Sequence, residues 1–514
     1  MTLAGFPEYT TTGLDIHVRR VIVSGNHLTG GEMFNDLREY ITRVEELGEL
    51  RVIEGADWDL EIGHISELAL SVPNPPLLLF DKIKGYPAGY RVVTGVLTSP
   101  RQVSLGLELP LDLSGMDQVR AWRDKVRAGF ELVPPMERKS GSVKENIHIG
   151  DEVDLYEFPT PKYKELDGGR YIGTGDMVIQ KDPDSGWVNL GTYRVQIQDS
   201  RTATIHSVGG HHGALIAKKY WDRGLSCPTA VVCGADPQLW GVSLASVPLE
   251  VGEYDYAGWI RNKPVEVVRG ETVDLPIPAT AEIVLEGDWV PPEVETRMEG
   301  PFGEWEGYYA GGARLHSAFR VNAILHRNDP ILMGATFVVA SSDDEPYQTT
   351  TSSAALWDEL DRQIPGVTGV CFVGAARRHP MVVISMRQQY SGHAKQAAMI
   401  AAGAYRGASL VSRFIIVVDD DIDPSNISEV LWALATRCDP ETSIDIIGGR
   451  WSIASDPRIS PEQRERGELV CSTAMIYACK PFSWMEQFPH SIKSSSEVMD
   501  KVKEKWGRLL FGHT

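Results

Sequence analysis

Two glutamates, Glu299 and Glu304, lie five positions apart in the segment EGPFGEW, separated in part by Gly300, Pro301 and Gly303. Side chains on one face of a helix recur every three or four positions, so this spacing does not suit a helix. Glycine and proline favour instead a loop of fixed shape. Such a loop could present the two acids as a proton-transfer pair or as metal ligands. An exposed acidic turn is the alternative interpretation.

A second candidate pair lies in the segment NLGTYR, where Asn189 and Arg194 follow a strand pattern five positions apart. Successive side chains of a strand point to opposite faces, so an odd spacing separates the amide from the guanidinium. A bulge or a strand end between them would bring both groups to the same side. The two residues can therefore cooperate only where the strand is interrupted.

Paired histidines, His211 and His212, stand between glycines in the segment GGHHG, where a helical pattern begins. Backbone N–H groups at a helix N-terminus can bind a phosphate, although two histidines in a surface loop would give the same pattern. Glu253 opens another helical pattern just before YDYAG. The amide, imidazole and carboxylate of Asn189, His212 and Glu253 suit Mn²⁺ or Mg²⁺ better than structural zinc. Such a site requires the three residues to converge in the fold.

Two further polar segments lie in the last third of the chain. Asp419, Asp420 and Asp421 end a strand pattern and could bind Mg²⁺ or a ribose hydroxyl. No glycine-rich phosphate loop precedes them, which favours a structural role. In the segment SGHAK, His393 could line a pocket or cap a helix at the surface. Neither a P-loop nor a nucleophile elbow is present.

Composition restricts the partners of the chain. With 50 basic and 70 acidic residues, the formal net charge is −20, which argues against nucleic acids and anionic membranes. A small anionic substrate stays possible, because a local arginine can override the global field. No apolar run approaches a membrane span, and no signal peptide is evident. The 6 cysteines form no C-x-x-C pair or zinc spacing, so we expect a cytoplasmic location.

Periodicity divides the chain into parts that must position these residues. Residues 1–32 have no strong period and are expected to form an N-terminal extension. Helical spacing in MFNDLREYITRVEELGEL and EIGHISELAL, and strand patterns in PPLLLF and YRVVTGVLTS, predict a small α/β domain over 33–125. Short strand patterns such as GTGDMVIQKD and WVNLGTYRVQIQD dominate 126–330, which is typical of a barrel or sandwich.

The C-terminal part alternates between strand and helix patterns over residues 331–490, as in MVVISM, GHAKQAAMIAAGAY and RFIIVVDDD. This alternation predicts βαβ units on a largely parallel sheet. Residues 491–514 contain SSSEVMDKVKEKWGRLL, which predicts an amphipathic helix that packs on its own chain or on a partner subunit. The fold class is therefore a multidomain mixture of α+β and α/β units.

A resemblance emerges from the order of the motifs. NLGTYR, GGHHG, PLEVGEYDYAG, AEIVLEG, EGPFGEWEGYYA, GHAKQ and VVDDDIDPSNISEVLWALATR occur in sequence, and together they resemble the UbiD family of prenylated-flavin-dependent decarboxylases. Each motif alone is weakly specific, whereas the ordered set, which runs from about Met33 to the C-terminus, is highly specific. The resemblance implies a split β-barrel domain that binds flavin and a C-terminal α/β oligomerisation domain. It also implies a homodimer or a homohexamer.

The resemblance further implies the cofactor, prenylated FMN, held with Mn²⁺ (or Mg²⁺) and K⁺ and supplied by a separate flavin prenyltransferase. The implied metal ligands are Asn189, His212 and Glu253. The implied catalytic residues are Arg194, Glu299 and Glu304. The other implied flavin contacts are Thr174, Thr192, Arg194, His211, Pro248 and Arg413.

Three positions depart from the family pattern. Arg413 stands where the family has a lysine near the phosphate, which puts that contact in doubt. Glu304 stands where the last acid of the triad can be aspartate. His211 occupies a position where some members have glutamine.

The implied reaction is the reversible, non-oxidative decarboxylation of an aromatic, heteroaromatic or α,β-unsaturated carboxylic acid. The flavin forms a covalent adduct with the substrate and acts as electron sink, and Glu304 protonates the carbon that CO₂ leaves. Alternatives are a physiological carboxylase, a ubiquinone-precursor (4-hydroxybenzoate-type) decarboxylase, and a flavin-binding scaffold subunit. Residues expected to line the substrate pocket are Trp305, Thr349, Thr350, Thr351 and His393.

Overall fold

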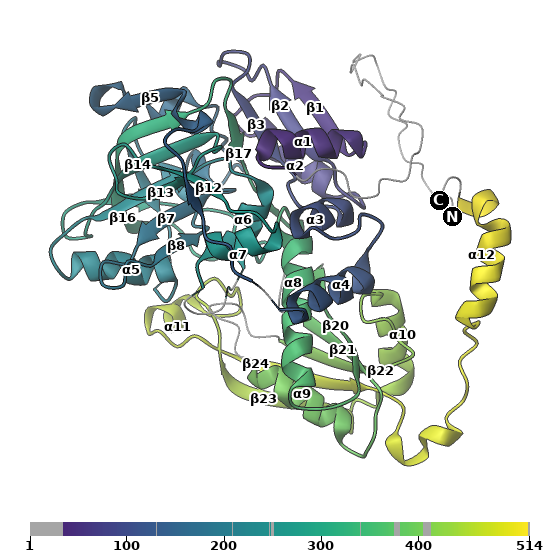
Figure 1. Ribbon diagram of the computed structural model, residues 1–514. Coiled ribbons are helices and arrows are strands. Elements are labelled where there is room, and N and C mark those ends of the chain that lie inside the picture. Colours follow the sequence, from purple (N-terminus) through teal and green to yellow (C-terminus); the bar gives the residue numbers. More distant parts are fainter. Residues whose placement is uncertain are drawn as a thin grey trace, which may run out of the picture.

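The computed structural model describes residues 34–129, 131–207, 209–245, 247, 251–339, 341–374, 381–404 and 413–511. The expected N-terminal extension, residues 1–32, therefore lies outside the described residues. Figure 1 shows an N-terminal unit in purple and a central, mostly teal unit side by side, above a green C-terminal unit. This arrangement is the mixed α/β multidomain fold that the sequence predicts.

A four-stranded sheet with the order β1-β2-β3-β17 organises the N-terminal unit. Its fourth strand, β17, pairs in parallel with β3. This strand follows the central unit in the sequence, so the N-terminal sheet includes a segment from beyond that unit. The predicted first helix forms and buries Leu37, Tyr40, Ile41 and Val44. The elements are α1 (Leu37–Glu46), β1 (Leu50–Glu54), α2 (Glu61–Leu70), β2 (Leu77–Asp81), β3 (Arg91–Thr94), α3 (Pro100–Leu107), α4 (Gly115–Arg127) and β17 (Ile331–Met333).

The central unit is built on a ten-stranded antiparallel sheet, whose main path runs β6-β9-β10-β16-β14-β11-β7-β8. β15 and β5 pair with β16 outside that path, and β13-β12-β4 form a separate small sheet. The strands are β4 (Met136–Glu137), β5 (Asn146–Ile149), β6 (Tyr171–Gly173), β7 (Met177–Lys181), β8 (Val188–Gly191), β9 (Val195–Ile197), β10 (Thr202–Ile205), β11 (Cys227–Val232), β12 (Glu266–Arg269), β13 (Pro276–Pro278), β14 (Ile283–Trp289), β15 (Thr296–Glu299) and β16 (Arg314–His326). The helices are α5 (His212–Trp221), α6 (Pro237–Leu244) and α7 (Glu253–Ile260), with 3-10 turns η1 (Ser142–Lys144), η2 (Gly150–Glu152) and η3 (Leu155–Glu157).

The two ends of the large sheet come together at one short link. β8 ends the path, and β9 lies next to the other end, yet only residues 192–194 separate them in the chain. A link this short forces the sheet to curl until its ends nearly meet. The sheet is therefore a curled, open barrel, with Arg194 at its seam.

The C-terminal unit contains a five-stranded sheet with the order β20-β21-β22-β24-β23. Its three central strands, β21, β22 and β24, run parallel, as the β–α alternation predicts, while β20 and β23 at the edges run antiparallel. Its elements, with the small hairpin before it, are β18 (Phe337–Val338), β19 (Ser341–Ser342), α8 (Glu345–Asp361), β20 (Val367–Phe372), β21 (Met381–Met386), α9 (His393–Gly403), β22 (Phe414–Asp419), α10 (Ile427–Arg437), β23 (Ile444–Trp451), α11 (Pro461–Glu465), β24 (Val470–Ala478), η5 (Phe482–Gln487) and α12 (Ser496–Phe511).

Helix α8 connects the C-terminal unit to the N-terminal unit by packing against α4. Arg123 of α4 lies over the ring of Trp357 at 4.2 Å and donates to Asp358 over 2.9 Å.

The last helix, α12, stands apart from the rest of the chain in Figure 1. Among the described residues, no helix has the length and apolar character needed to cross a membrane.

Candidate active site

The guanidinium of Arg194 joins the two glutamates of the EGPFGEW segment. Nε and Nη2 of Arg194 donate to Oε1 and Oε2 of Glu299 over 2.8 and 3.0 Å. Nη1 donates to Oε1 of Glu304 over 2.7 Å. The exposed fractions of the three side chains are 10%, 1% and 12%, so solvent screens these contacts little. The fold thus brings the three expected catalytic residues into one hydrogen-bonded group.

A hairpin explains the five-residue spacing of the acids. Glu299 is the last residue of β15 and pairs with Arg314 of β16, while Glu304 lies in the loop between these strands. The loop turns at Gly300, whose φ of +86° is in the left-handed region that favours glycine. Its N–H donates to Oε1 of Gln196 over 2.9 Å, which fixes the start of the loop on β9.

Arg194 reaches the same site because the strand is interrupted. The pattern over residues 187–199 predicts one strand, but β8 ends at Gly191 and β9 begins at Val195. The break frees Thr192, Tyr193 and Arg194 from the alternation of a regular strand. This break between β8 and β9 is the strand interruption that Asn189 and Arg194 need in order to lie on the same side.

The charges of the site stabilise one another. Burial by itself would raise the pKa of Glu299, but hydrogen bonds from His206 and Arg194 and their charges outweigh it and hold the pKa well below its usual range. Burial lowers the pKa of Arg194, yet the two glutamates more than reverse this effect. Glu299 and Arg194 therefore form a permanently ionised pair near neutral pH.

Two histidines that the sequence analysis did not select complete the group. Nδ1 of His206, just after β10, lies 3.1 Å from Nη2 of Arg194 and 3.3 Å from Oε2 of Glu299. It also lies 3.2 Å from Nε2 of His316 on β16. Burial and the neighbouring His206 lower the pKa of His316 to about 4. In the sequence, these histidines stand out only in that both lie in or beside strand patterns. The pairing of β10 with β16 brings them together in the fold.

The expected metal ligands lie on or beside β8. The N–H of Leu190 donates to Oε2 of Glu253 over 3.2 Å, so this carboxylate from the start of α7 lies against β8 beside Asn189. The N–H of Gly213 donates to the hydroxyl of Tyr193 over 3.1 Å, which anchors the start of α5, and thus His212, at the link between β8 and β9.

The chemistry of this donor set fits a hard divalent cation. Glu253 is 5% exposed, and burial raises its pKa to about 7. Asn189 is 2% exposed, and its amide Oδ1 is an oxygen donor of the kind that hard cations prefer. Among the described residues, no basic side chain pairs with the buried carboxylate of Glu253, and a divalent cation would supply a compensating positive charge.

Three of the expected flavin contacts, Thr174, Thr192 and His211, lie near the same seam. Oγ1 of Thr174 accepts from the N–H of Ala335 over 2.9 Å, and Oγ1 of Thr192 donates to the carbonyl of Asp176 over 3.0 Å. His211 stacks on Tyr193 at 5.7 Å, and its buried Nδ1 has no hydrogen-bond partner. Pro248 lies outside the described residues.

Asp176 is a further buried acid that the sequence analysis did not select. It is fully buried, and neither carboxyl oxygen has a hydrogen-bond partner. Burial therefore raises the pKa of Asp176 well above its usual range.

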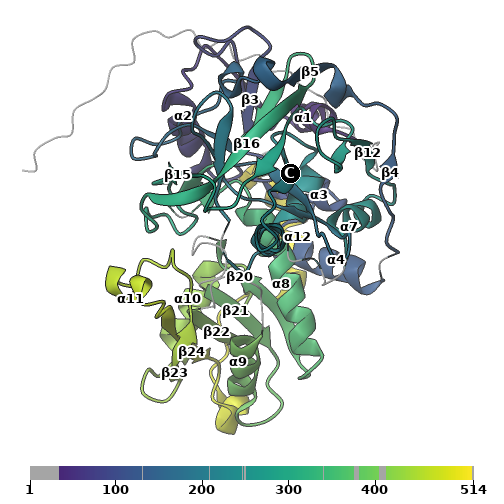
Figure 2. The same cartoon turned by 90° about the vertical axis from the view of Figure 1, so that its left-hand side faces the viewer.

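The C-terminal unit borders the site. Figure 2 shows β15 at the edge of the central unit that faces the C-terminal unit. Ser455 donates a hydrogen bond to Glu306 of the β15–β16 loop. The next residue, Asp456, accepts from Nη2 of Arg413 over 2.6 Å. Arg413 therefore already pairs with Asp456, the residue next to Ser455, and Ser455 contacts the β15–β16 loop.

The residues expected in the substrate pocket lie in three places. Trp305 follows Glu304 in the loop and is partly buried. The three threonines follow one another on α8, so they point about 100° apart around the helix. The hydroxyl of Thr350 reaches Gln118 of α4, within 3.5 Å of its Oε1. His393 begins α9, where it is buried, stacks on Tyr390 at 4.1 Å and accepts from the N–H of Gln389. Their role in substrate binding stays a prediction.

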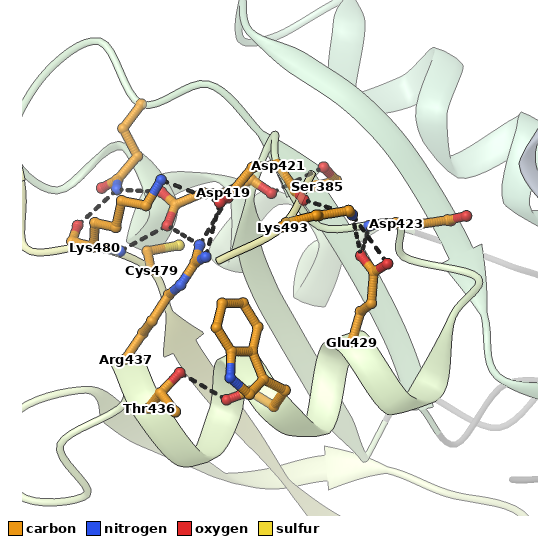
Figure 3. Close-up of polar contacts among 12 residues, drawn as sticks. Ser385, Asp419, Asp421, Asp423, Glu429, Thr436, Arg437, Cys479, Lys480 and Lys493 are labelled. Carbon is orange, nitrogen blue, oxygen red and sulfur yellow. Dashed lines mark hydrogen bonds and ion pairs between the residues drawn. The ribbon is translucent and has the colours of Figure 1, made fainter. Parts of the chain in front are cut away.

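Basic side chains neutralise Asp419, Asp420 and Asp421, and Figure 3 shows the contacts of Asp419 and Asp421. Arg437 donates to Asp419 over 2.8 Å and to both oxygens of Asp421 over 2.8 Å. The backbone N–H of Lys480 donates to Asp419, and its ammonium group lies 3.2 Å from Asp421. Asp420 pairs with Arg387 over 2.8 Å. These contacts support the structural role that the sequence favours.

Family models match three consecutive parts of the chain. They are the N-terminal domain of 3-octaprenyl-4-hydroxybenzoate carboxy-lyase over residues 41–122, its Rift-related domain over 135–341 and its C-terminal domain over 347–478. A phenolic acid decarboxylase from Sedimentibacter hydroxybenzoicus is 32% identical over 461 residues, which cover 87% of this chain and 92% of the relative.

Solved structures agree with these matches. Vanillic acid decarboxylase from Sedimentibacter hydroxybenzoicus, in its open form, has a TM-score of 0.80 at 28% identity and covers 93% of this chain and 100% of its own. The UbiD-class enzyme HmfF from Pelotomaculum thermopropionicum, in complex with FMN, has a TM-score of 0.80 at 28% identity, with coverages of 91% and 99%. An evolved dimeric form of HmfF in complex with prFMN has a TM-score of 0.76 at 26% identity, with coverages of 91% and 98%. The fold, the ordered domain matches and the shared sequence all lead to one assignment: the chain belongs to the UbiD family of carboxy-lyases.

Proposed function

We propose that the chain catalyses the reversible, non-oxidative decarboxylation of an aromatic, heteroaromatic or α,β-unsaturated carboxylic acid with prenylated FMN. The observation that carries the proposal is the guanidinium of Arg194, shared between Glu299 and Glu304. The names of the relatives, which act on phenolic and vanillic acids, support an aromatic acid as substrate. A scaffold subunit would have no need for three ionisable groups in this arrangement.

Arg194 is the group that orients the substrate carboxylate. Its planar fork can bind one carboxylate through two parallel hydrogen bonds. Glu299 already takes two of its N–H groups and fixes the orientation of the guanidinium. The remaining side, where Nη1 now donates to Glu304, is the side on which a substrate carboxylate would compete for the arginine.

Glu304 is the proposed proton donor. With Glu299 ionised, a bound substrate carboxylate would be the third anion around one guanidinium. A proton on Glu304 removes one of these charges as the substrate displaces it from Nη1. Glu304 then carries a proton beside the carbon that loses CO₂, which is the requirement for a general acid.

The proposed cofactor set is prenylated FMN with Mn²⁺ (or Mg²⁺) and K⁺. Asn189, His212 and Glu253 would hold the divalent cation, and Thr174, Thr192, His211, Pro248 and Arg413 would contact the flavin. When bound, the prenylated flavin supplies an electron sink for the carbanion-like character that develops as CO₂ leaves. A flavin prenyltransferase would supply this cofactor, and the complexes of HmfF with FMN and prFMN support the assignment.

Glu304→Gln tests the role of the acid, because it keeps the size of the side chain but cannot donate a carboxyl proton. We expect kcat for decarboxylation of a panel of aryl and acrylic acids to fall about 10²- to 10⁴-fold while flavin content stays unchanged. Glu295→Gln is the matched control, since Glu295 leads into the same hairpin and pairs with Arg297 and Arg320. Full activity of Glu304→Gln would overturn the role of proton donor.

His212→Ala tests the cofactor site independently of turnover. Protein produced together with a flavin prenyltransferase is expected to carry prenylated FMN, seen by absorbance and by the mass of the released cofactor. The variant is expected to lose it, whereas His64→Ala, at an exposed histidine of α2, keeps it. A parent protein without flavin would contradict the proposed cofactor. Product analysis at high bicarbonate then shows whether carboxylation is the favoured direction.

A further inference from the structure

A second group of polar side chains lies at the outer edge of the central unit, on β5, η3 and β16. We call His148, Glu157 and His326 the histidine–glutamate cluster. Nδ1 of His148 lies 3.1 Å from Oε2 of Glu157, and Nε2 of His326 lies 3.5 Å from Oε1 of the same carboxylate. One ligand atom from each residue lies within 4.8 Å of the others, which is the spacing a single metal ion needs. Pairing of β5 with β16 places His148 opposite Ile324, which brings both imidazoles to one face.

The surroundings of His326 fix its tautomer. Its side chain is 4% exposed, and Nδ1 lies 2.9 Å from the carbonyl oxygen of Arg327. A carbonyl only accepts hydrogen bonds, so Nδ1 carries the proton and Nε2 presents a lone pair. Nε2 is buried and has no hydrogen-bond partner in the described part of the chain. Metal-ligating histidines show this arrangement, because the second ring nitrogen donates to a backbone carbonyl.

The other two members also meet without a hydrogen bond. Nδ1 of His148 is buried and lacks a hydrogen-bond partner, although the carboxylate of Glu157 is close. The hydroxyl of Tyr90 donates to Oε1 of Glu157 over 3.1 Å. A carboxylate only accepts hydrogen bonds, so the phenol of Tyr90 is the donor in this contact. Tyr90 thus orients the carboxylate of Glu157, just as a residue that hydrogen-bonds to a metal ligand orients that ligand.

The active-site histidines provide a contrast. His206, Glu299 and His316 have a similar spacing, but the guanidinium of Arg194 already neutralises that carboxylate. Among the described residues, the only basic groups within 4.0 Å of the Glu157 carboxylate are the imidazoles of His148 and His326. The charge that a cation would supply is therefore lacking at Glu157 and already present at Glu299.

We infer that the histidine–glutamate cluster binds a divalent transition cation, with zinc as the best match to two imidazoles and one carboxylate. The exposed fractions of 31% for His148 and 22% for Glu157 leave solvent access for a fourth ligand. The ion would tie β5 and η3 to the end of β16, next to Tyr90 of the N-terminal unit. This inference is independent of the proposed function, because no residue of the cluster belongs to the proposed metal or catalytic sets.

Co²⁺ binding to the full-length chain tests the inference, since bound Co²⁺ has a visible spectrum that reports nitrogen and oxygen ligands. The parent in this experiment is His212→Ala, prepared without flavin and stripped of metal, so that the proposed Mn²⁺ site does not contribute. We expect one equivalent of Co²⁺ to bind, and Zn²⁺ to displace it. Adding His148→Ala is expected to abolish binding, whereas adding His64→Ala is not. His64 is the matched control because it is an exposed histidine 3.2 Å from the carboxylate of Glu165, and the described residues offer this pair no third ligand.

Tyr90→Phe is the second variant, because it keeps all three ligands and the aromatic ring. Loss of the outer hydrogen bond is expected to raise the Kd about 10- to 100-fold without changing the number of sites. The inference is overturned if the parent binds no Co²⁺ at micromolar concentrations, or if the His148→Ala variant binds it equally well. Thermal unfolding in the absence of metal confirms that each variant is folded before titration.

Discussion

Arg194 illustrates how one residue can organise a site through contacts on all its donor atoms. It binds Glu299 with two N–H groups, Glu304 with a third, and lies beside His206. The ring of Phe302 lies 5.3 Å from the guanidinium carbon and covers one of its faces. Lysine has no comparable planar fork, so the position requires arginine specifically.

His316 gives the site a pH dependence of its own. The folded pKa of about 4 lies below the value of about 6.5 in the unfolded chain. The unfolded chain therefore binds more protons between these values. Protonation of His316 therefore does not reduce the free energy of unfolding above about pH 6.5. As the pH falls towards 4, it reduces the free energy of unfolding by at most about 1.4 kcal/mol per pH unit.

His316→Gln should remove this dependence, since glutamine does not titrate. We expect the Tm of the variant to fall less than that of the parent between pH 6.5 and pH 4. The groups that face His316 are His206, Glu299, Arg194 and Arg314, and they remain in the variant. Parallel Tm profiles for parent and variant over this range would contradict the prediction.

At the scale of elements, an interrupted strand and a hairpin assemble the site. The break between β8 and β9 supplies Arg194, and the loop between β15 and β16 supplies Glu304. The starts of α5 and α7 add His212 and Glu253. These four side chains therefore lie where a strand or helix begins or ends. At such points a side chain is not bound by the alternation of a regular strand.

The junction of β22 and α10 shows how the C-terminal sheet is held (Figure 3). Arg437 at the end of α10 is 2% exposed and pairs with Asp419 and Asp421 at the end of β22. Arg437→Met would leave the buried carboxylate of Asp419 without its cation. We expect a loss of about 3–5 kcal/mol in the free energy of unfolding, measured in urea.

Lys395→Met is the control for Arg437→Met. Lys395 pairs with Asp445 at 2.8 Å, but both side chains are exposed to solvent, at 52% and 37%. Screening by water limits such a pair to less than about 1 kcal/mol. Equal effects of the two substitutions would show that the buried network does not stabilise the unit.

At the scale of the whole molecule, the units are joined by shared elements. β17 returns to the N-terminal sheet after the central unit, and α8 packs on α4. The domain limits expected from the sequence, at 32, 125, 330 and 490, stay a prediction. The proposed homodimer or homohexamer also stays a prediction, and α12 is the element that most needs a partner. Its exposed apolar residues are Val498, Met499, Val502, Trp506, Leu509, Leu510 and Phe511.

Removal of α12 tests its role in assembly. Apolar residues that recur at helical spacing and face solvent favour burial against another surface. We expect a chain ending at residue 494 to have a lower oligomer mass in light scattering than the full chain, and Trp506→Asp to act in the same direction. Glu504→Gln, on an exposed polar position of α12, is the control. An unchanged mass for the truncated chain would show that assembly uses another surface.

The sequence by itself determined the features that local physics and the ordered motifs can specify. The first helix follows from its apolar spacing, and the β–α alternation gives the parallel centre of the C-terminal sheet. Gly300 marks the turn beside Glu299 because its conformation favours glycine. The motifs from NLGTYR to VVDDDIDPSNISEVLWALATR led to the family, and the domain matches confirm it.

Only the tertiary structure decided which distant residues meet. His206 and His316 come together through the pairing of β10 with β16, and β17 joins β3 across more than 200 residues of chain. His148, Glu157 and His326 are likewise separated in the sequence and meet only on the folded sheet. Strand pairing depends on the burial of whole faces rather than on local spacing, so periodicity along the chain does not encode such contacts.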